Sequence, residues 1–432
     1  MSAHDDLLAR HRAVMPDWLS LYYEHPIALE HGKGRRVTDA EGRTYLDFFA
    51  GILTTMLGYD VPEVTEAIAE QTAKIIHSST LYLGEPMIEL AEEIAALSGI
   101  PDAKVFFTTS GSEANEAALL LASTARRSSQ VLAVRNSYHG RSFATMGVTG
   151  NRGWSSSSLS PFSVCWLASG YRLRSPFRHL AHDDAAFTAA CVEDLHEVIA
   201  TQTAGDVAAL IAEPIQGVGG FAVPPDGFLG AYQDALREHG VLVIADEVQT
   251  GWGRTGEHFW GYEAQGLAPD LMTFAKGVGN GVALAGVVGR AEIVDGLGAN
   301  SISTFGGGPL VSAAGLATLR YVREHDLQSN AAAMGARLRA EIDPLTDRHA
   351  AVAEVRGKGL MIGIELVDDD GWTPSPARAS AVLERTRELG LLVGKGGLYG
   401  NCLRIAPALT LTADEADEGA AVLVKACEEV LG

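Results

Sequence analysis

Short apolar runs alternate with helical patterns over most of this 432-residue chain, and this alternation constrains the fold more than any other feature. The runs include KVFFTT, QVLAV, DVAALIAEP, VLVIADE, DLMTFAK and ALAGVVG, and helical stretches such as PEVTEAIAEQTAKI and EANEAALLLASTARR lie before or between them. Strands that alternate with helices in this way predict an open, mostly parallel α/β sheet. Such a sheet binds its ligands beyond the carboxyl ends of its strands.

The pattern also predicts a division of the chain. Residues 1–60 combine a polar helical start with a hairpin-like pair in RRVTDAEGRTYLDFFAG, and residues 61–320 carry the alternation. From about 321 the pattern changes to YVREHDLQSNAAAMGARLRAEI and VAEVRGKGLMIGIEL. We therefore expect an N-terminal segment (1–60) that joins a small domain, a large ligand-binding domain (61–320) and a C-terminal α+β small domain (321–432).

Charge and cysteine content exclude several classes of protein. The 33 basic and 54 acidic residues give a net charge of −21, whereas binding to nucleic acid needs clustered Lys and Arg. The four cysteines are scattered, so we expect reduced thiols and no metal site. The start MSAHDDLLARHR lacks the apolar region of a secretory signal, and no apolar run approaches the roughly 18 residues of a membrane helix. We expect a cytoplasmic protein with neither nucleic acid nor membrane as a partner.

The stretch VLVIADEVQTGWGRTG (241–256) raises the main functional question, because GWGRTG matches the dinucleotide-binding pattern G-x-G-x-x-G. In a dinucleotide site these glycines directly follow a strand and open a helix. Here DEVQT separates the strand from Gly251, and the aromatic stretch EHFWGYEAQG follows. We therefore interpret the glycines as a coincidental turn, and a nicotinamide-dependent dehydrogenase is a remote alternative.

Two polar residues follow neighbouring predicted strands. Asp246 ends VLVIAD, and Lys276 follows the apolar run DLMTFA and precedes a glycine-rich loop. Asp246 could cap a turn and Lys276 could be a solvated loop residue. If the two strands are parallel neighbours, however, both side chains emerge at the ligand-binding edge. A lysine can then form a Schiff base while a carboxylate keeps a pyridine nitrogen protonated.

A third motif, TTSGSEANE, places hydroxyl groups and a glycine at the start of a predicted helix. Ser110 and Glu113 have the spacing of a capping box. Gly111 and Ser112 would also offer free N–H groups to a phosphate at the positive end of the helix dipole. A phosphate, a Schiff base and a pyridinium together describe pyridoxal 5′-phosphate (PLP).

From YLDFFAGI to LRIAPALTLT the chain resembles the class III PLP-dependent aminotransferases of fold type I. The resemblance implies a mostly parallel seven-stranded sheet in a large domain, plus a smaller α+β domain. It implies that Lys276 forms the Schiff base with PLP and that Asp246 pairs with the pyridine nitrogen. Further cofactor contacts that it implies are Val248 and Tyr138 on the two ring faces, His139 beside Tyr138, Gln249 at the phenolic oxygen, Gly111 and Ser112 at the phosphate, and Thr304 at the phosphate of a neighbouring subunit.

The contact expected of Thr304 implies a homodimer with shared active sites, and the resemblance leaves open whether dimers assemble further. For the substrate, it implies that Arg404 binds the α-carboxylate through its planar guanidinium. Glu213 matches a residue that in relatives pairs with this arginine when no carboxylate is present. Arg141 matches a position that in some relatives binds a distal carboxylate.

Among subgroups, the motifs look most like the alanine–glyoxylate aminotransferases, with 4-aminobutyrate and other ω-amino-acid transaminases close behind. Tyr59 and Val61 stand where relatives usually carry histidines. We expect a ping-pong transfer from an amino acid to an oxo acid such as pyruvate, glyoxylate or 2-oxoglutarate, with Lys276 as general base. A PLP-dependent decarboxylase or aminomutase is an alternative on the same residues, and a non-catalytic scaffold is a remote one.

Overall fold

The computed structural model describes residues 3–432, and a seven-stranded central sheet forms its largest layer. The strand order is β4-β10-β9-β8-β7-β5-β6, and β10 alone runs antiparallel to its two neighbours. The predicted seven-stranded, mostly parallel sheet is therefore confirmed. Its strands are β4 (Ala103–Thr108), β5 (Gln130–Val134), β6 (Ser163–Leu167), β7 (Ala209–Ala212), β8 (Leu242–Asp246), β9 (Leu271–Phe274) and β10 (Ala285–Arg290).

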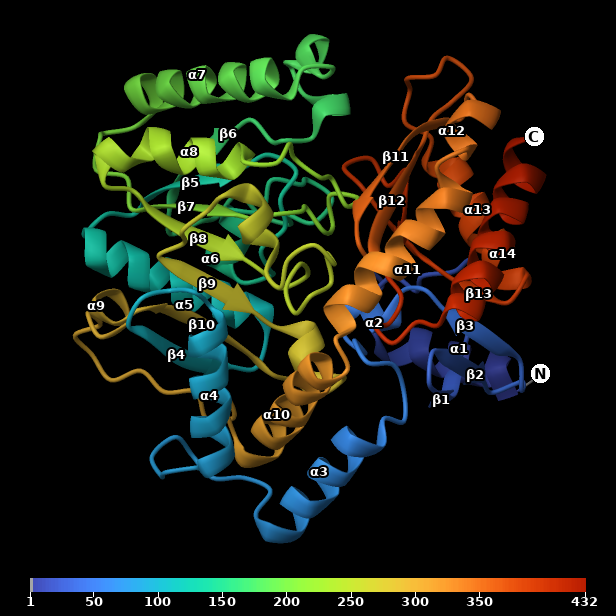
Figure 1. The fold of residues 1–432 in the computed structure, drawn as a ribbon, viewed down its shortest axis with the longest axis horizontal. Coiled ribbons are helices and arrows are strands. Elements are labelled where there is room, and N and C mark those ends of the chain that lie inside the picture. Colours follow the sequence, from blue (N-terminus) through green and yellow to red (C-terminus); the bar gives the residue numbers. More distant parts are fainter. Residues whose placement is uncertain (1–2) are drawn as a thin grey trace.

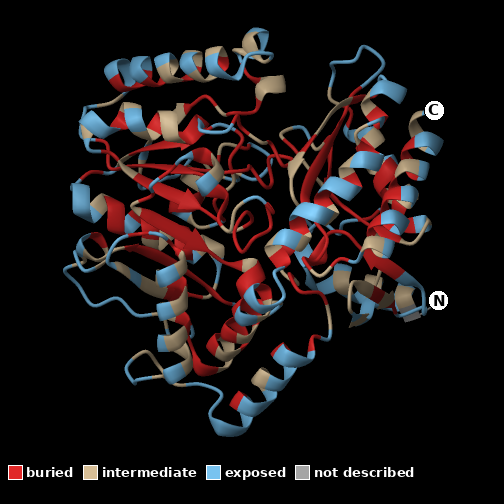
Figure 2. Ribbon diagram, in the orientation of Figure 1, coloured by how far each residue is buried: buried red, intermediate tan, exposed pale blue. Residues whose placement is uncertain are grey.

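Helices cover both faces of the central sheet (Figure 1). In β5, Leu132 packs into one apolar layer, and its neighbours Val131 and Ala133 pack into the other. Because successive side chains of a strand point to opposite faces, a sheet buried on both sides needs such continuous apolar runs; Figure 2 shows these strands as buried. One face carries α5 (Gly111–Arg126), α6 (Phe143–Gly147) and α9 (Ala291–Val294), and the other α4 (Glu85–Leu97), α7 (Asp184–Gln202), α8 (Phe228–Leu236) and α10 (Pro309–Glu324).

Two four-stranded sheets lie beside this layer. The N-terminal sheet has the order β1-β2-β3-β13, and its antiparallel pair β2–β3 forms the predicted hairpin. The C-terminal sheet has the order β11-β12-β15-β14. Their strands are β1 (Leu29–Lys33), β2 (Arg36–Asp39), β3 (Thr44–Asp47), β13 (Leu391–Leu392), β11 (Val352–Lys358), β12 (Met361–Leu366), β14 (Gly394–Gly396) and β15 (Cys402–Ile405).

The other helices mostly cover these smaller sheets or connect them to the central one (Figure 1). The domain boundaries near residues 60 and 320 stay a prediction, and the first two residues of the 1–60 segment lie outside the described residues. Within residues 3–432, no helix has the length and apolar content that crossing a membrane requires. The remaining helices are α1 (Ala3–Val14), α2 (Ala50–Leu53), α3 (Pro62–Lys74), α11 (Leu327–Ile342), α12 (Leu345–Arg348), α13 (Pro376–Glu388) and α14 (Ala413–Leu431), with short 3₁₀ turns η1 (Arg172–Arg174), η2 (Arg178–Leu180), η3 (Arg237–His239), η4 (Gly261–Gln265) and η5 (Lys276–Gly279).

Candidate active site

A cavity of about 620 Å³ lies where the parallel strands end, at the edge expected for a ligand. This volume lies in the range typical of small-molecule sites. Arg404 and Thr304 are the two predicted site residues that do not line it. Those that line it are Gly111, Ser112, Tyr138, His139, Arg141, Glu213, Asp246, Val248, Gln249 and Lys276.

Lys276 and Asp246 reach the cavity from neighbouring strands, as expected. β8 and β9 are parallel, and Asp246 at the end of β8 pairs with Thr273 of β9. Lys276 comes two residues after Phe274, the last residue of β9, so both side chains lie at the same edge of the sheet. Lys276 has a left-handed backbone with a φ of 51°, a strained conformation that clusters at functional sites. Burial lowers the pKa of its amine to about 8, although the nearby carboxylates of Asp246 and Glu213 oppose this shift. The neutral, basic form of Lys276 is therefore far more accessible near neutral pH than that of an ordinary lysine.

Three groups fix the carboxylate of Asp246. Its Oδ2 accepts a hydrogen bond from Nδ2 of Asn115 at 2.8 Å and lies 2.8 Å from Nδ1 of His139, and its Oδ1 accepts from the N–H of Val248 at 3.1 Å. Because an ionised carboxylate only accepts, Nδ1 of His139 is the donor. Sequence reasoning missed Asn115, although an amide on the buried face of the helix in EANEAALLLA was a signal for it.

The start of α5 closes another part of the cavity. Oγ of Ser110 accepts from the N–H of Glu113 at 3.2 Å, but the Glu113 carboxylate accepts from Thr109 and not from Ser110, so the predicted capping box is only half formed. The N–H groups of Gly111 and Ser112 are among the four that a helix cannot satisfy internally. They are thus available to an anion in the cavity.

Polar and aromatic groups line the space between these two ends. The buried Oε1 of Gln249 has no hydrogen-bond partner among the described residues. The ring of Tyr138 lines the cavity and contacts Trp154 edge-on, with 5.4 Å between ring centroids. Trp154 lies in the serine-rich loop and was not predicted as a site residue.

Arg404 lies on β15 and is not among the residues that line this cavity. Its guanidinium lies 4.8 Å from the ring of Phe49 and 5.4 Å from that of Phe221, and its Nη1 donates to the carbonyl of Gly217 at 3.2 Å. Its Nε is buried without a partner among the described residues. The predicted pairing with Glu213 is not formed, because the carboxylate of Glu213 instead accepts the N–H groups of Tyr138 (2.9 Å) and Gly217 (2.8 Å).

These residues fit PLP. The free N–H groups of α5 suit the phosphate, the fixed carboxylate of Asp246 suits a protonated pyridine nitrogen, and the side-chain amide of Gln249, which lines the cavity, can donate an N–H to the phenolic oxygen. A methyl group at Gly140 would come within 2.6 Å of Oγ of Ser112, so the glycine keeps the phosphate end open. The positions of Gly111, Ser112 and Gly140 therefore fit the phosphate of a PLP molecule held by Lys276.

Comparison with known proteins gives a consistent picture. The family model "Aminotransferase class-III" matches residues 21–427. The chain is 40% identical over 418 residues to an Arabidopsis thaliana protein named alanine–glyoxylate aminotransferase 2 homolog 2, mitochondrial, with 96% of this chain and 85% of that protein covered. It is 36% identical to human alanine–glyoxylate aminotransferase 2, mitochondrial, over 96% of this chain and 84% of that protein.

Solved transaminase structures share the fold. A thermostable (S)-enantioselective ω-transaminase from Thermomicrobium roseum matches with a TM-score of 0.90, 33% identity and full coverage of both chains (100%). A PLP-bound amine transaminase from an uncultivated Pseudomonas species matches with a TM-score of 0.87 and 33% identity, covering 94% of this chain and 95% of that one.

Proposed function

The chain belongs to the class-III aminotransferases and is a PLP-dependent enzyme that moves amino groups from amino acids to oxo acids; from this premise we propose the roles of its residues and the class of its substrates. The observation that carries the proposal is the convergence of Lys276, Asp246 and the free start of α5 on one cavity. PLP, bound to a lysine, supplies an electron sink that stabilises the negative charge left when a proton is removed beside the amino nitrogen.

Lys276 has two tasks in this proposal. Its Nζ would hold the cofactor covalently, and its free amine would take the proton from the donor carbon that carries the nitrogen. The lowered pKa of the amine, about 8, makes it a competent base. The carboxylate of Asp246 would stabilise a positive charge on the pyridine nitrogen, and His139 and Asn115 orient it.

The donor is an amino acid whose carboxylate binds Arg404. The guanidinium has no carboxylate partner among the described residues and lies between two aromatic rings, so an incoming carboxylate replaces no ion pair. Arg141 lines the cavity and could bind a second, distal carboxylate. Relatives named alanine–glyoxylate, 5-aminovalerate and 4-aminobutyrate aminotransferases support both α- and ω-amino acids as donors.

The active enzyme is a homodimer. The segments 75–83 and 302–305 form an exposed apolar face that includes Leu81, Leu83 and Phe305, and His77 packs against Phe305 at 5.1 Å. An exposed apolar surface of this kind marks a protein contact. Thr304 lies on this face, outside its own cavity, which supports its contact with the phosphate bound by a second copy.

The cytoplasm is the proposed location. All four cysteines are buried free thiols, which fits a reducing compartment. Two relatives carry the word mitochondrial in their names, so fractionation of cells that express the protein would decide between the compartments.

The visible absorbance of the purified protein tests the function. We expect a Schiff-base band that disappears when an effective donor is added without an acceptor, in a panel of L-alanine, 4-aminobutyrate, β-alanine, 3-aminoisobutyrate and ornithine. Its return on addition of an oxo acid distinguishes transfer from decarboxylation or isomerisation, which need no separate acceptor. A protein that stays colourless after incubation with PLP would contradict the roles proposed for Lys276 and Asp246.

A further inference from the structure

Two arginines from loops that follow central-sheet strands contact opposite ends of the strand pair β12–β15. Arg174 follows β6, and Arg254 follows β8 within GWGRTG. The pair β12–β15 carries Arg404, which lies opposite Gly363 in the middle of the register.

Arg254 binds the end of this pair where β12 begins and β15 has ended. Its Nη1 donates to the carbonyls of Leu360 (3.0 Å) and Pro407 (2.9 Å), and the N–H of Leu360 donates back to the carbonyl of Arg254 (3.1 Å). The residue is only 2% exposed and forms no ion pair among the described residues, and burial lowers the pKa of its guanidinium to about 9. Burying a cation without a counter-charge costs free energy, which the hydrogen bonds to the two carbonyls offset in part.

The glycines on either side of Arg254 let its loop approach α11 closely. A methyl group at Gly253 would lie 2.9 Å from Cβ of Gln328, and one at Gly256 would lie 2.6 Å from Cα of Ala332, both on α11. Both glycines also have a positive φ, 79° and 77°. GWGRTG is thus a turn that opens no helix, as expected, and its glycines also let this loop pack directly against α11.

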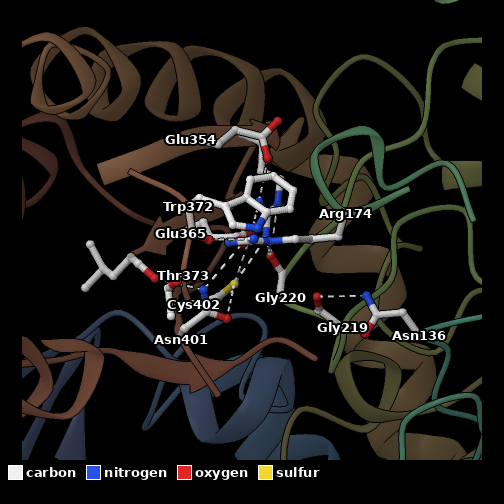
Figure 3. Close-up of polar contacts among 12 residues, drawn as sticks. Asn136, Arg174, Gly219, Gly220, Glu354, Glu365, Trp372, Thr373, Asn401 and Cys402 are labelled. Atoms are coloured by element: carbon white, nitrogen blue, oxygen red, sulfur yellow. Dashed lines mark hydrogen bonds and ion pairs between the residues drawn. The ribbon is translucent and has the colours of Figure 1, made fainter. Parts of the chain in front are cut away.

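Arg174 binds the other end of the strand pair (Figure 3). Its Nε donates to Oε1 of Glu365 at 2.8 Å, its Nη1 donates to the carbonyl of Trp372 at 2.7 Å, and its guanidinium stacks on the Trp372 ring at 4.5 Å. Glu365 is the last β12 residue paired with β15, opposite Cys402. The side chains of Arg174 and Glu365 are 5% and 0% exposed, so solvent barely screens this ion pair.

We propose that Arg174 and Arg254 are positioning residues that hold the strand pair at both ends and thereby fix Arg404 relative to Lys276 and Asp246. The carboxylate of the donor can then bind Arg404 while its amino group meets the cofactor. The proposal rests on the substrate role of Arg404 proposed above. Correct placement matters because a displacement of about 1 Å can lower a rate by roughly 100-fold.

Arg174→Lys and Arg254→Lys test the proposal, because lysine keeps the charge but lacks the planar fork. Propionate, which has the carboxylate of alanine but no amino group, serves as a competitive probe. We expect the Ki of propionate and the KM of L-alanine to rise together by about tenfold or more in each variant, with kcat falling less and with PLP content and the visible band unchanged. Lys358→Met is the matched control, because the Lys358 side chain forms ion pairs with Asp226 and Glu257, whereas only its backbone pairs with β12, opposite Met361.

The outcomes separate the two proposals. A propionate Ki that is unchanged in Arg174→Lys and Arg254→Lys but raised in Arg404→Lys would overturn the positioning role alone. A Ki that is unchanged in Arg404→Lys would overturn the substrate role of Arg404 and the positioning role with it. An equal rise in Lys358→Met, or loss of folded, PLP-binding protein in both arginine variants, would also overturn the positioning role, because the arginines would then act on the fold as a whole.

Discussion

Glu213 and Arg404 bind opposite sides of the same peptide residue and do not bind each other. Oε2 of Glu213 accepts the N–H of Gly217 at 2.8 Å, and Nη1 of Arg404 donates to the Gly217 carbonyl at 3.2 Å. A side chain at Gly217 would collide with Gln249, since a methyl group there would lie 2.3 Å from Nε2. Arg404, which we propose as the substrate-binding arginine, and the buried carboxylate of Glu213 are thus linked through Gly217.

The first prediction follows for Glu213→Gln. A glutamine oxygen can accept only one of the two N–H groups that Glu213 holds, so we expect the free energy of unfolding to fall by about 1–3 kcal/mol. Because no ion pair with Arg404 is broken, the KM of carboxylate donors should change less than about threefold. This is well under the tenfold change in affinity that corresponds to about 1.4 kcal/mol. Urea denaturation and steady-state kinetics measure the two effects. A tenfold fall in KM would mean that Glu213 competes with the substrate for Arg404.

The second prediction concerns the pH dependence of Lys276 in PLP-free protein. Its pKa is lowered from 10.5 to about 8, so its acylation rate should rise with a midpoint near pH 8, as followed by peptide mass spectrometry. Between these values the unfolded chain binds a proton that the folded chain has released, so this group makes stability increase as pH rises from about 8 to 10.5. Lys276→Met should lose that increase. A midpoint near 10.5 would show that the amine is solvated.

How far the sequence predicted the site depends on whether a contact follows from strand order. Asp246 and Lys276 were predicted together because residues that follow neighbouring parallel strands share one edge of the sheet. Arg404 lies on β15 of the C-terminal sheet and Gly217 in the loop after β7 of the central sheet, and their contact depends on packing that periodicity does not encode. The packing role of the GWGRTG glycines was not predicted for the same reason, since their neighbours lie on α11, more than 70 residues later in the chain.

The third prediction is that Asp246→Asn lowers kcat by at least about 100-fold while the protein still binds PLP. A neutral amide cannot stabilise a positive pyridine nitrogen, so the electron sink is lost, whereas the N–H groups of Gly111 and Ser112 proposed for the phosphate are untouched. Single-turnover absorbance with L-alanine measures the rate, and PLP titration measures the affinity. A near-normal single-turnover rate in Asp246→Asn would show that the Asp246 carboxylate is not needed for the reaction.

The fourth prediction uses two glycines with positive φ. Gly140→Ala would place a methyl group 2.6 Å from Oγ and 2.9 Å from Cα of Ser112, which forces the start of α5 to move. We expect at least about a tenfold loss of PLP affinity, or 1.4 kcal/mol. In Gly205→Ala the backbone strain is similar, with a φ of 87°, but nothing lies within 4 Å of the new methyl group. That control should lose stability without losing PLP affinity, and an equal loss of affinity in both would point to strain alone.

The last prediction concerns the apolar face formed by segments 75–83 and 302–305. Leu83 is 94% exposed in the single chain, which is a large apolar area to leave in water unless a second copy covers it. Leu83→Asp would place an unpaired charge in that contact, so we expect the variant to sediment as a monomer at micromolar concentration. We also expect it to lose most of its activity, because Thr304 of a second copy can then no longer reach the phosphate. Leu29→Asp is the control, since Leu29 is another exposed leucine (50%) but lies on β1 of the N-terminal sheet. A fully active Leu83→Asp monomer would show that each chain holds a complete site and that Thr304 has no part in it.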